Sequence, residues 1–288
     1  MKLLFYLLLA TIGSSCTKAP IKREKLYIVS TTTLMKDLVD TIWADKVESA
    51  SLMGPGVDPH LYQPTAKDLS KLEEADVIVA HGLHLEGKMV EALESLAKKK
   101  RVVIIGHVLD SKKLIDHGGA IDPHTWFDPA LWIESAKILA NAEGLPPFDP
   151  KNFLDFSKKV EELSVKYKKI FQSIPKEQRI LITSHDAFHY LGRFFDIDVQ
   201  GVQGVSTDSE VGVKRIDDLI QLIKKKKIKS IFSETSVSAR AINKLLSESG
   251  AQLGGVLYSD ALGAIGSGSD TYLGMLEHNL KTIYEGLK

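Results

Sequence analysis

The chain has 288 residues, a formal net charge of zero and a single cysteine. A near-neutral chain lacks the positive charge that phosphate backbones attract, which argues against nucleic acid as a partner. One cysteine excludes an intramolecular disulfide and a thiolate metal site, so any bound metal must be held by nitrogen and oxygen atoms. The chain has one dense basic run, Lys224–Lys227 with Lys229. This run lies at the C-terminal end of an amphipathic segment, which indicates a solvated helix end.

The first residues predict export from the cytoplasm. Residues 1–15 combine a basic start, an apolar run and small residues, which is typical of a secretory signal peptide, and the run is too short to span a bilayer. Cys16 follows directly and resembles the lipidated first residue of bacterial lipoproteins, although Gly13 stands where leucine is usual. We therefore expect a signal peptide over residues 1–15 and a lipidated tether over residues 16–23, anchored to a membrane without spanning it. The alternative is ordinary signal cleavage, with Cys16 removed or left free.

From residue 24 onward, strand-like and helix-like segments alternate. The apolar patterns predict strands over residues 26–30, 47–53, 76–80, 101–105, 179–183, 198–202, 230–233 and 252–257. They predict helices over residues 33–43, 65–74, 86–98, 129–142, 187–195, 213–225, 239–249 and 272–287. This alternation is typical of α/β proteins, in which parallel strands are flanked by helices.

One long helix separates two α/β halves. Asp149 and Pro150 suit the N-cap and the first position of a helix, and apolar residues recur at three- and four-residue steps until Pro175. At about 1.5 Å per residue this helix is on the order of 35 Å long, the width of a small domain. The predicted domains are an N-terminal α/β lobe, a linking helix and a C-terminal α/β lobe, over residues 24–147, 148–175 and 176–288.

Two copies of the tripeptide Asp-Pro-His stand out, Asp58-Pro59-His60 and Asp122-Pro123-His124. Proline fixes its own φ and keeps the preceding residue out of the helical region, so the backbone aims each imidazole. A metal site requires such pre-aimed ligands, because ordering them during binding subtracts from affinity. The alternative is two ordinary Asp-Pro turns that carry a histidine.

Four candidate metal ligands each follow a predicted strand, two in each half: His60, His124, His185 and Asp260. Ligands of open α/β sheets bind beyond the carboxyl ends of the strands, so these four side chains would have to meet in a cleft between the lobes. Three imidazoles and a carboxylate suit Zn²⁺ and accept Mn²⁺ or Fe²⁺.

The outer nitrogens of ligating histidines need hydrogen-bond acceptors. Candidates are Asp58, Asp122, Asp186 and Glu234, each of which could equally cap a helix or fix a turn.

The other histidines have ordinary interpretations. His189 lies four residues after His185 on a predicted helix, but Asp186 stands where a metalloprotease motif has glutamate, so we expect His189 to be packed or on the surface. Surface positions are expected for His107, His117 and His278.

The chain resembles the cluster A-I solute-binding lipoproteins, the manganese- and zinc-binding receptors of bacterial ABC importers. The resemblance covers nearly the whole mature chain. It is carried by the two Asp-Pro-His motifs, the long central helix, and the segments Gly82-Leu83-His84-Leu85-Glu86, Thr183-Ser184-His185-Asp186-Ala187-Phe188 and Leu257-Tyr258-Ser259-Asp260-Ala261-Leu262.

The resemblance implies a rigid two-lobed receptor that holds its ion through His60, His124, His185 and Asp260 and delivers it to a membrane permease. It also places His84 near the cleft without a ligand role. Zinc-specialised members often carry a histidine-rich loop, whereas Asp110–Ala120 holds only His117, which favours manganese or mixed specificity. Manganese-selective members often have glutamate where this chain has His185, which favours zinc. The sequence therefore leaves the ion open.

We expect a monomeric receptor with no catalytic residues, with zinc or manganese as its transported ligand. The rival from another class is a zinc hydrolase of the cell envelope, in which an unpaired Glu234 would activate a metal-bound water. A surface adhesin would also fit an anchored lipoprotein, but nothing in the sequence encodes an adhesive partner.

Overall fold

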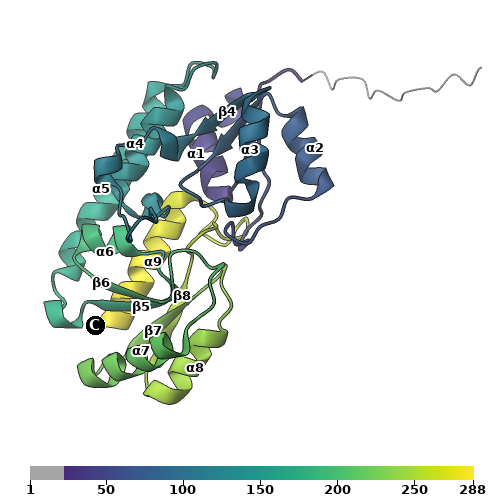
Figure 1. Cartoon of the computed structure of the whole chain (residues 1–288). Helices are drawn as coiled ribbons and strands as arrows, with labels where there is room; N and C mark the ends of the chain where they lie inside the picture. Colours follow the sequence, from purple (N-terminus) through teal and green to yellow (C-terminus); the bar gives the residue numbers. More distant parts are fainter. Residues whose placement is uncertain (1–22) are drawn as a thin grey trace, which may run out of the picture.

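The computed structural model describes residues 23–288 and shows two α/β lobes beside a long helix (Figure 1). The predicted signal peptide and all of the predicted tether except Arg23 lie outside the described residues. Within residues 23–288, no helix is both long enough and apolar enough to cross a membrane.

The N-terminal lobe is a four-stranded parallel sheet with the strand order β2-β1-β3-β4. Its strands are β1 (Tyr27–Ser30), β2 (Glu48–Ser51), β3 (Val77–Ala80) and β4 (Arg101–Ile104). Its helices are α1 (Thr33–Trp43), α2 (Ala66–Glu74), α3 (Val90–Ala97) and α4 (Pro129–Ala140). Successive strand residues point to opposite faces: Val77 and Val79 join the core beneath α1, while Ile78 packs with Leu72 of α2 and Leu93 of α3.

The C-terminal lobe contains two parallel strand pairs rather than one continuous ladder. Its strands are β5 (Ile180–His185), β6 (Asp198–Gln203), β7 (Ser230–Glu234) and β8 (Gln252–Leu257). The pairs are β5–β6 and β7–β8, and β5 lies beside β7. Its helices are α6 (His189–Phe195), α7 (Val213–Lys226), α8 (Arg240–Ser249) and α9 (Tyr272–Leu287). The basic run lies at the exposed C-terminal end of α7, as predicted.

The long helix α5 (Pro150–Phe171) begins as predicted, with the Asp149 carboxylate accepting a hydrogen bond from the Lys151 N–H. It ends at Phe171 rather than beside Pro175, because the N–H groups of Ser173 and Ile174 bond to carbonyls three residues back and tighten the last turn. The helix packs against α1 and α4 of the first half and against α6 and α9 of the second. A long helix joining two lobes is confirmed, while the domain limits 24–147, 148–175 and 176–288 stay a prediction.

Hydrogen bonds tie the lobes together close to the candidate ligands. The Trp126 Nε1–H donates to the Ser259 carbonyl at 2.9 Å, and the Tyr272 hydroxyl donates to the Trp126 carbonyl at 2.9 Å. On the α1 side, the Leu262 N–H donates to the Thr33 hydroxyl at 2.9 Å. These buried contacts fix the separation of the loops that carry His124 and Asp260, which preorganises whatever those loops bind.

Candidate metal centre

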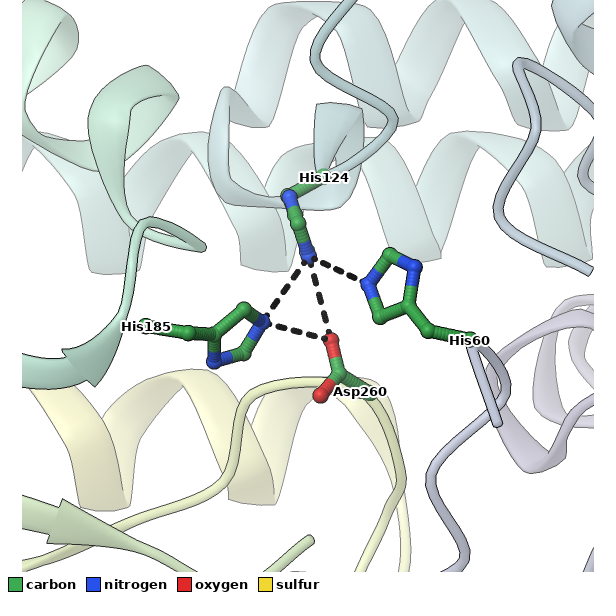
Figure 2. Close-up of side chains that lie close together, drawn as sticks. All are labelled: His60, His124, His185 and Asp260. Carbon is green, nitrogen blue, oxygen red and sulfur yellow. Dashed lines mark hydrogen bonds and ion pairs between the residues drawn. The ribbon is translucent and has the colours of Figure 1, made fainter. Parts of the chain in front are cut away.

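The four predicted ligands converge at one point between the lobes (Figure 2). His60 lies in the loop after β2 and His124 in the loop between β4 and α4, whereas His185 is the last residue of β5 and Asp260 lies between β8 and α9. One nitrogen or oxygen atom from each lies within 4.8 Å of the others. His60 is 4 % exposed, and the other three side chains are 1 % exposed or less.

The spacing of these atoms suits a four-coordinate ion. His124 Nε2 lies 3.4 Å from His60 Nε2, 3.3 Å from His185 Nε2 and 3.2 Å from Asp260 Oδ1. A tetrahedron with metal–ligand bonds of about 2.0–2.1 Å has edges of about 3.3–3.4 Å. Asp260 Oδ1 is buried and has no hydrogen-bond partner among the described residues. A buried carboxylate oxygen is costly to leave unpaired, so a cation at the centre would satisfy it.

The two Asp-Pro-His loops aim their histidines in the same way. Asp58 accepts a hydrogen bond from the His60 N–H at 2.9 Å, and Asp122 accepts one from the His124 N–H at 2.9 Å. Such a bond to the N–H two residues on is how aspartate fixes a tight turn. The other lobe holds Asp58 in place, because the Thr207 hydroxyl donates to it at 2.6 Å.

Two of the four expected acceptors orient a ligand ring. His124 Nδ1 donates to Asp122 at 2.8 Å and His185 Nδ1 donates to Glu234 at 2.5 Å, which turns both Nε2 atoms toward the centre. Glu234 also accepts the His185 N–H at 2.9 Å. The other two do not act in this way: Asp58 fixes its own turn, and Asp186 accepts from the Gly201 N–H at 2.5 Å.

The charges around the centre set the proton occupancy of the imidazoles. Burial lowers the pKa of His60 to about 3, so this ring is neutral. Burial also opposes a charge on His185, but Glu234 and Asp260 outweigh it and raise the pKa of His185 well above its usual value. The pKa of His124 is raised by Asp122 and Asp260 against the same opposing burial. An ion entering the centre must therefore displace protons.

The expected helix over residues 187–195 starts late. Strand β5 runs on through His185, which pairs with Gln203 of β6, so α6 begins only at His189. His185 and His189 therefore do not share a helix face. His189 is half-buried, with Nε2 3.2 Å from Asp186, which fits the expectation of a packed or surface residue.

His117 lies at the surface, as expected, and its ring also approaches the buried Asp122. Its Nε2 lies 3.5 Å from Asp122 Oδ2, and its ring packs on that of His189 with a centroid separation of 4.7 Å. The nearby Asp122 carboxylate raises the pKa of His117. The exposed positions expected for His107 and His278 are confirmed, and His84 is exposed outside the four-residue cluster.

A buried network that sequence reasoning missed supports the His124 loop. Glu86 accepts hydrogen bonds from the His81 N–H at 2.8 Å, the Gly82 N–H at 2.9 Å and the Thr31 hydroxyl at 2.6 Å. The His81 Nε2–H in turn donates to the carbonyl of Pro123 at 2.5 Å. Burial lowers the pKa of His81 to about 4, so a neutral ring makes this bond. The one sequence feature that pointed toward this network was Glu86, which lies in the Gly82–Glu86 segment that carries the family resemblance.

Two lobes of parallel α/β structure, bridged by a long helix and enclosing imidazole and carboxylate groups, define the class of metal-binding solute receptors. The profile of one such family, the zinc-uptake complex component A, periplasmic (ZnuA), matches residues 28–286. The chain belongs to this family.

Characterised relatives cover nearly the whole chain. The manganese-binding lipoprotein MntA of Bacillus subtilis is 38 % identical over 277 residues, covering 92 % of this chain and 90 % of the relative. The zinc-binding protein TroA of Treponema pallidum is 37 % identical over 274 residues, covering 91 % and 89 %. The solved structure of the periplasmic zinc-binding protein TroA from Treponema pallidum aligns with a TM-score of 0.86 at 35 % identity, covering 91 % of this chain and 99 % of that chain.

Proposed function

We propose that the chain is an extracytoplasmic receptor that captures one Zn²⁺ or Mn²⁺ ion and delivers it to the permease of an ABC importer. In this proposal His60, His124 and His185 each donate Nε2 to the ion, and Asp260 donates Oδ1. The observation that carries it is the convergence of these four buried atoms, drawn from both lobes, at the spacing of a four-coordinate site. The relatives named for manganese and for zinc support both ions equally.

A receptor fits the site better than a hydrolase does. A catalytic zinc keeps one position for water beside a free base, whereas this centre offers four protein atoms. Glu234, the candidate base, is committed to the Nδ1–H and the N–H of His185. The family to which the chain belongs consists of solute-binding receptors rather than enzymes.

Metal titration tests the proposal. We expect one Zn²⁺ or Mn²⁺ ion per chain, measured by competition with a chromophoric chelator on protein first stripped of metal. Because the ion binds only the folded chain, a free concentration of about 100 times Kd adds about 2.7 kcal/mol of stability and raises Tm on the order of 5 °C. The absence of any Tm shift with either ion would contradict the receptor proposal.

The same titration has an expected pH dependence. Below the raised pKa of His185 the ring holds a proton in the metal-free protein, and binding must release it. Affinity should therefore fall as pH decreases, by about tenfold per unit for each proton released. A pH-independent affinity between pH 5 and 8 would contradict an imidazole site.

We also propose that Cys16 carries a lipid that anchors the mature protein to a membrane. The signal-like residues 1–15 and the relatives named as lipoproteins support this anchor. Cys16→Ser is expected to move the protein from the membrane fraction to the soluble fraction, with unchanged metal affinity as the control. Unaltered fractionation would leave ordinary signal cleavage as the explanation.

A further inference from the structure

Two serines hold one oxygen of the Asp260 carboxylate. Asp260 Oδ2 lies 2.8 Å from the Ser236 hydroxyl and 3.0 Å from the Ser259 hydroxyl, and the two hydroxyls lie 2.9 Å from each other. The hydrogen bond between the two serines uses only one of their two hydroxyl protons. At least one proton is therefore available for donation to Oδ2. The other oxygen, Oδ1, faces the imidazoles and lies 3.2 Å from His124 Nε2 and 3.5 Å from His185 Nε2 (Figure 2).

We propose that Ser236 and Ser259 determine metal selectivity by holding Asp260 as a one-oxygen ligand. This inference rests on the proposed receptor function and concerns the choice between zinc and manganese. One oxygen and three imidazoles make a four-coordinate set, which suits Zn²⁺. Mn²⁺ is a harder ion that favours additional oxygen ligands, and the nearest one is Asp260 Oδ2. To supply it, the carboxylate must rotate and give up its hydroxyl donors.

Hydrogen bonds hold the main chain around Asp260, so the orientation of its carboxylate is set by the side chain. The Ser259 carbonyl accepts the Trp126 Nε1–H at 2.9 Å, which ties this segment to the other lobe. One residue earlier, the N–H and carbonyl of Tyr258 bond to the Asn279 side chain at 3.0 and 2.7 Å. On the other side, the Leu262 N–H donates to the Thr33 hydroxyl at 2.9 Å. Because the main chain is held on both sides of Asp260, the two serine hydroxyls favour the carboxylate orientation in which Oδ1 faces the centre.

Ser236 links this arrangement to a second ligand. It follows β7 by two residues, and Glu234 at the end of β7 orients His185. One short segment, Glu234–Ser236, thus sets both the direction of an imidazole and the orientation of the carboxylate. Ser236 is a positioning residue that acts through Asp260.

The test compares zinc and manganese affinities in the full mature protein. The wild type is expected to bind Zn²⁺ more tightly than Mn²⁺. The double variant Ser236→Ala/Ser259→Ala should shift the ratio of the two dissociation constants toward Mn²⁺ by about tenfold. This factor corresponds to the free energy of one charge-assisted hydrogen bond, which the carboxylate of the variant no longer loses when it rotates. Ser236→Thr keeps the hydroxyl and should retain the wild-type ratio. Ser135→Ala is the matched control, because it removes another buried hydroxyl, bonded to the Leu131 carbonyl inside α4.

Cobalt provides a spectroscopic readout that a general loss of stability does not imitate. Four-coordinate Co²⁺ absorbs visible light strongly, and its absorption weakens when a fifth ligand joins. The wild type and Ser135→Ala should give the intense spectrum, and the double variant the weaker one. Ser236→Ala alone, a milder change at a half-buried residue, should show the same direction of shift.

An unchanged ratio and an unchanged cobalt spectrum in the double variant would overturn the inference while leaving the receptor function intact. Equal weakening of both ions with the intense spectrum retained would also overturn it, because the serines would then support the fold and not the ligand geometry. A wild type that binds neither ion would remove the proposed function itself, and the inference with it.

Discussion

His185→Ala is expected to weaken Zn²⁺ and Mn²⁺ binding by more than about 100-fold, beyond the loss that follows removal of an orienting partner. The variant deletes one of the four converging atoms and leaves Glu234 buried without its ring partner. Chelator competition on the purified variant measures the loss. Asp260→Ala should lower metal affinity by a factor of the same order. This variant removes the one anionic ligand of the cluster, which comes from the same lobe as His185.

The matched control is His107→Ala, which removes an exposed histidine outside the cluster. Its affinity should equal that of the wild type, and both ligand variants should keep the wild-type circular dichroism spectrum. Wild-type metal affinity in His185→Ala would show that the ion binds elsewhere.

Glu234→Ala is expected to lower metal affinity by about 10- to 100-fold, the usual consequence of removing the acceptor behind a ligating histidine. Both hydrogen bonds that orient His185 are lost in this variant. The Glu234 carboxylate also raises the pKa of His185, so its removal lowers that pKa and reduces proton competition. Metal binding in the variant should therefore be weaker overall and yet persist to lower pH.

Glu234→Gln separates the two effects. The amide oxygen still accepts a hydrogen bond but carries no charge, so the affinity loss should be smaller while the pH midpoint still moves down. A pH midpoint equal to that of the wild type in both variants would contradict the electrostatic role of Glu234.

The sequence predicted the parts of the fold and site that local patterns determine. Alternating apolar strands and helices specify parallel α/β lobes, and Asp149-Pro150 specifies the start of α5. The Asp-Pro-His motifs predict the aim of His60 and His124 because the orienting aspartate lies two residues from its histidine. These features depend on short stretches of chain, so they can be read without tertiary information.

The features that the sequence did not predict depend on contacts between distant segments. The end of β5 at His185 is set by pairing with Gln203 of β6, which overrides the local helical pattern. The bond from His81 to the Pro123 carbonyl joins residues 42 positions apart. Ser236 and Ser259 reach Asp260 through the packing of neighbouring loops, and an isolated serine in a loop carries no signal of such a role.

The central claim is that one ion is held by four atoms from both lobes, and anomalous X-ray scattering from crystals of the metal-loaded protein tests it most directly. Data collected at the absorption edge of the bound metal should show one strong peak, about 2.0–2.2 Å from Nε2 of His60, His124 and His185 and from Oδ1 of Asp260. A peak outside this cluster, or one contacted by side chains of a single lobe, would contradict the account.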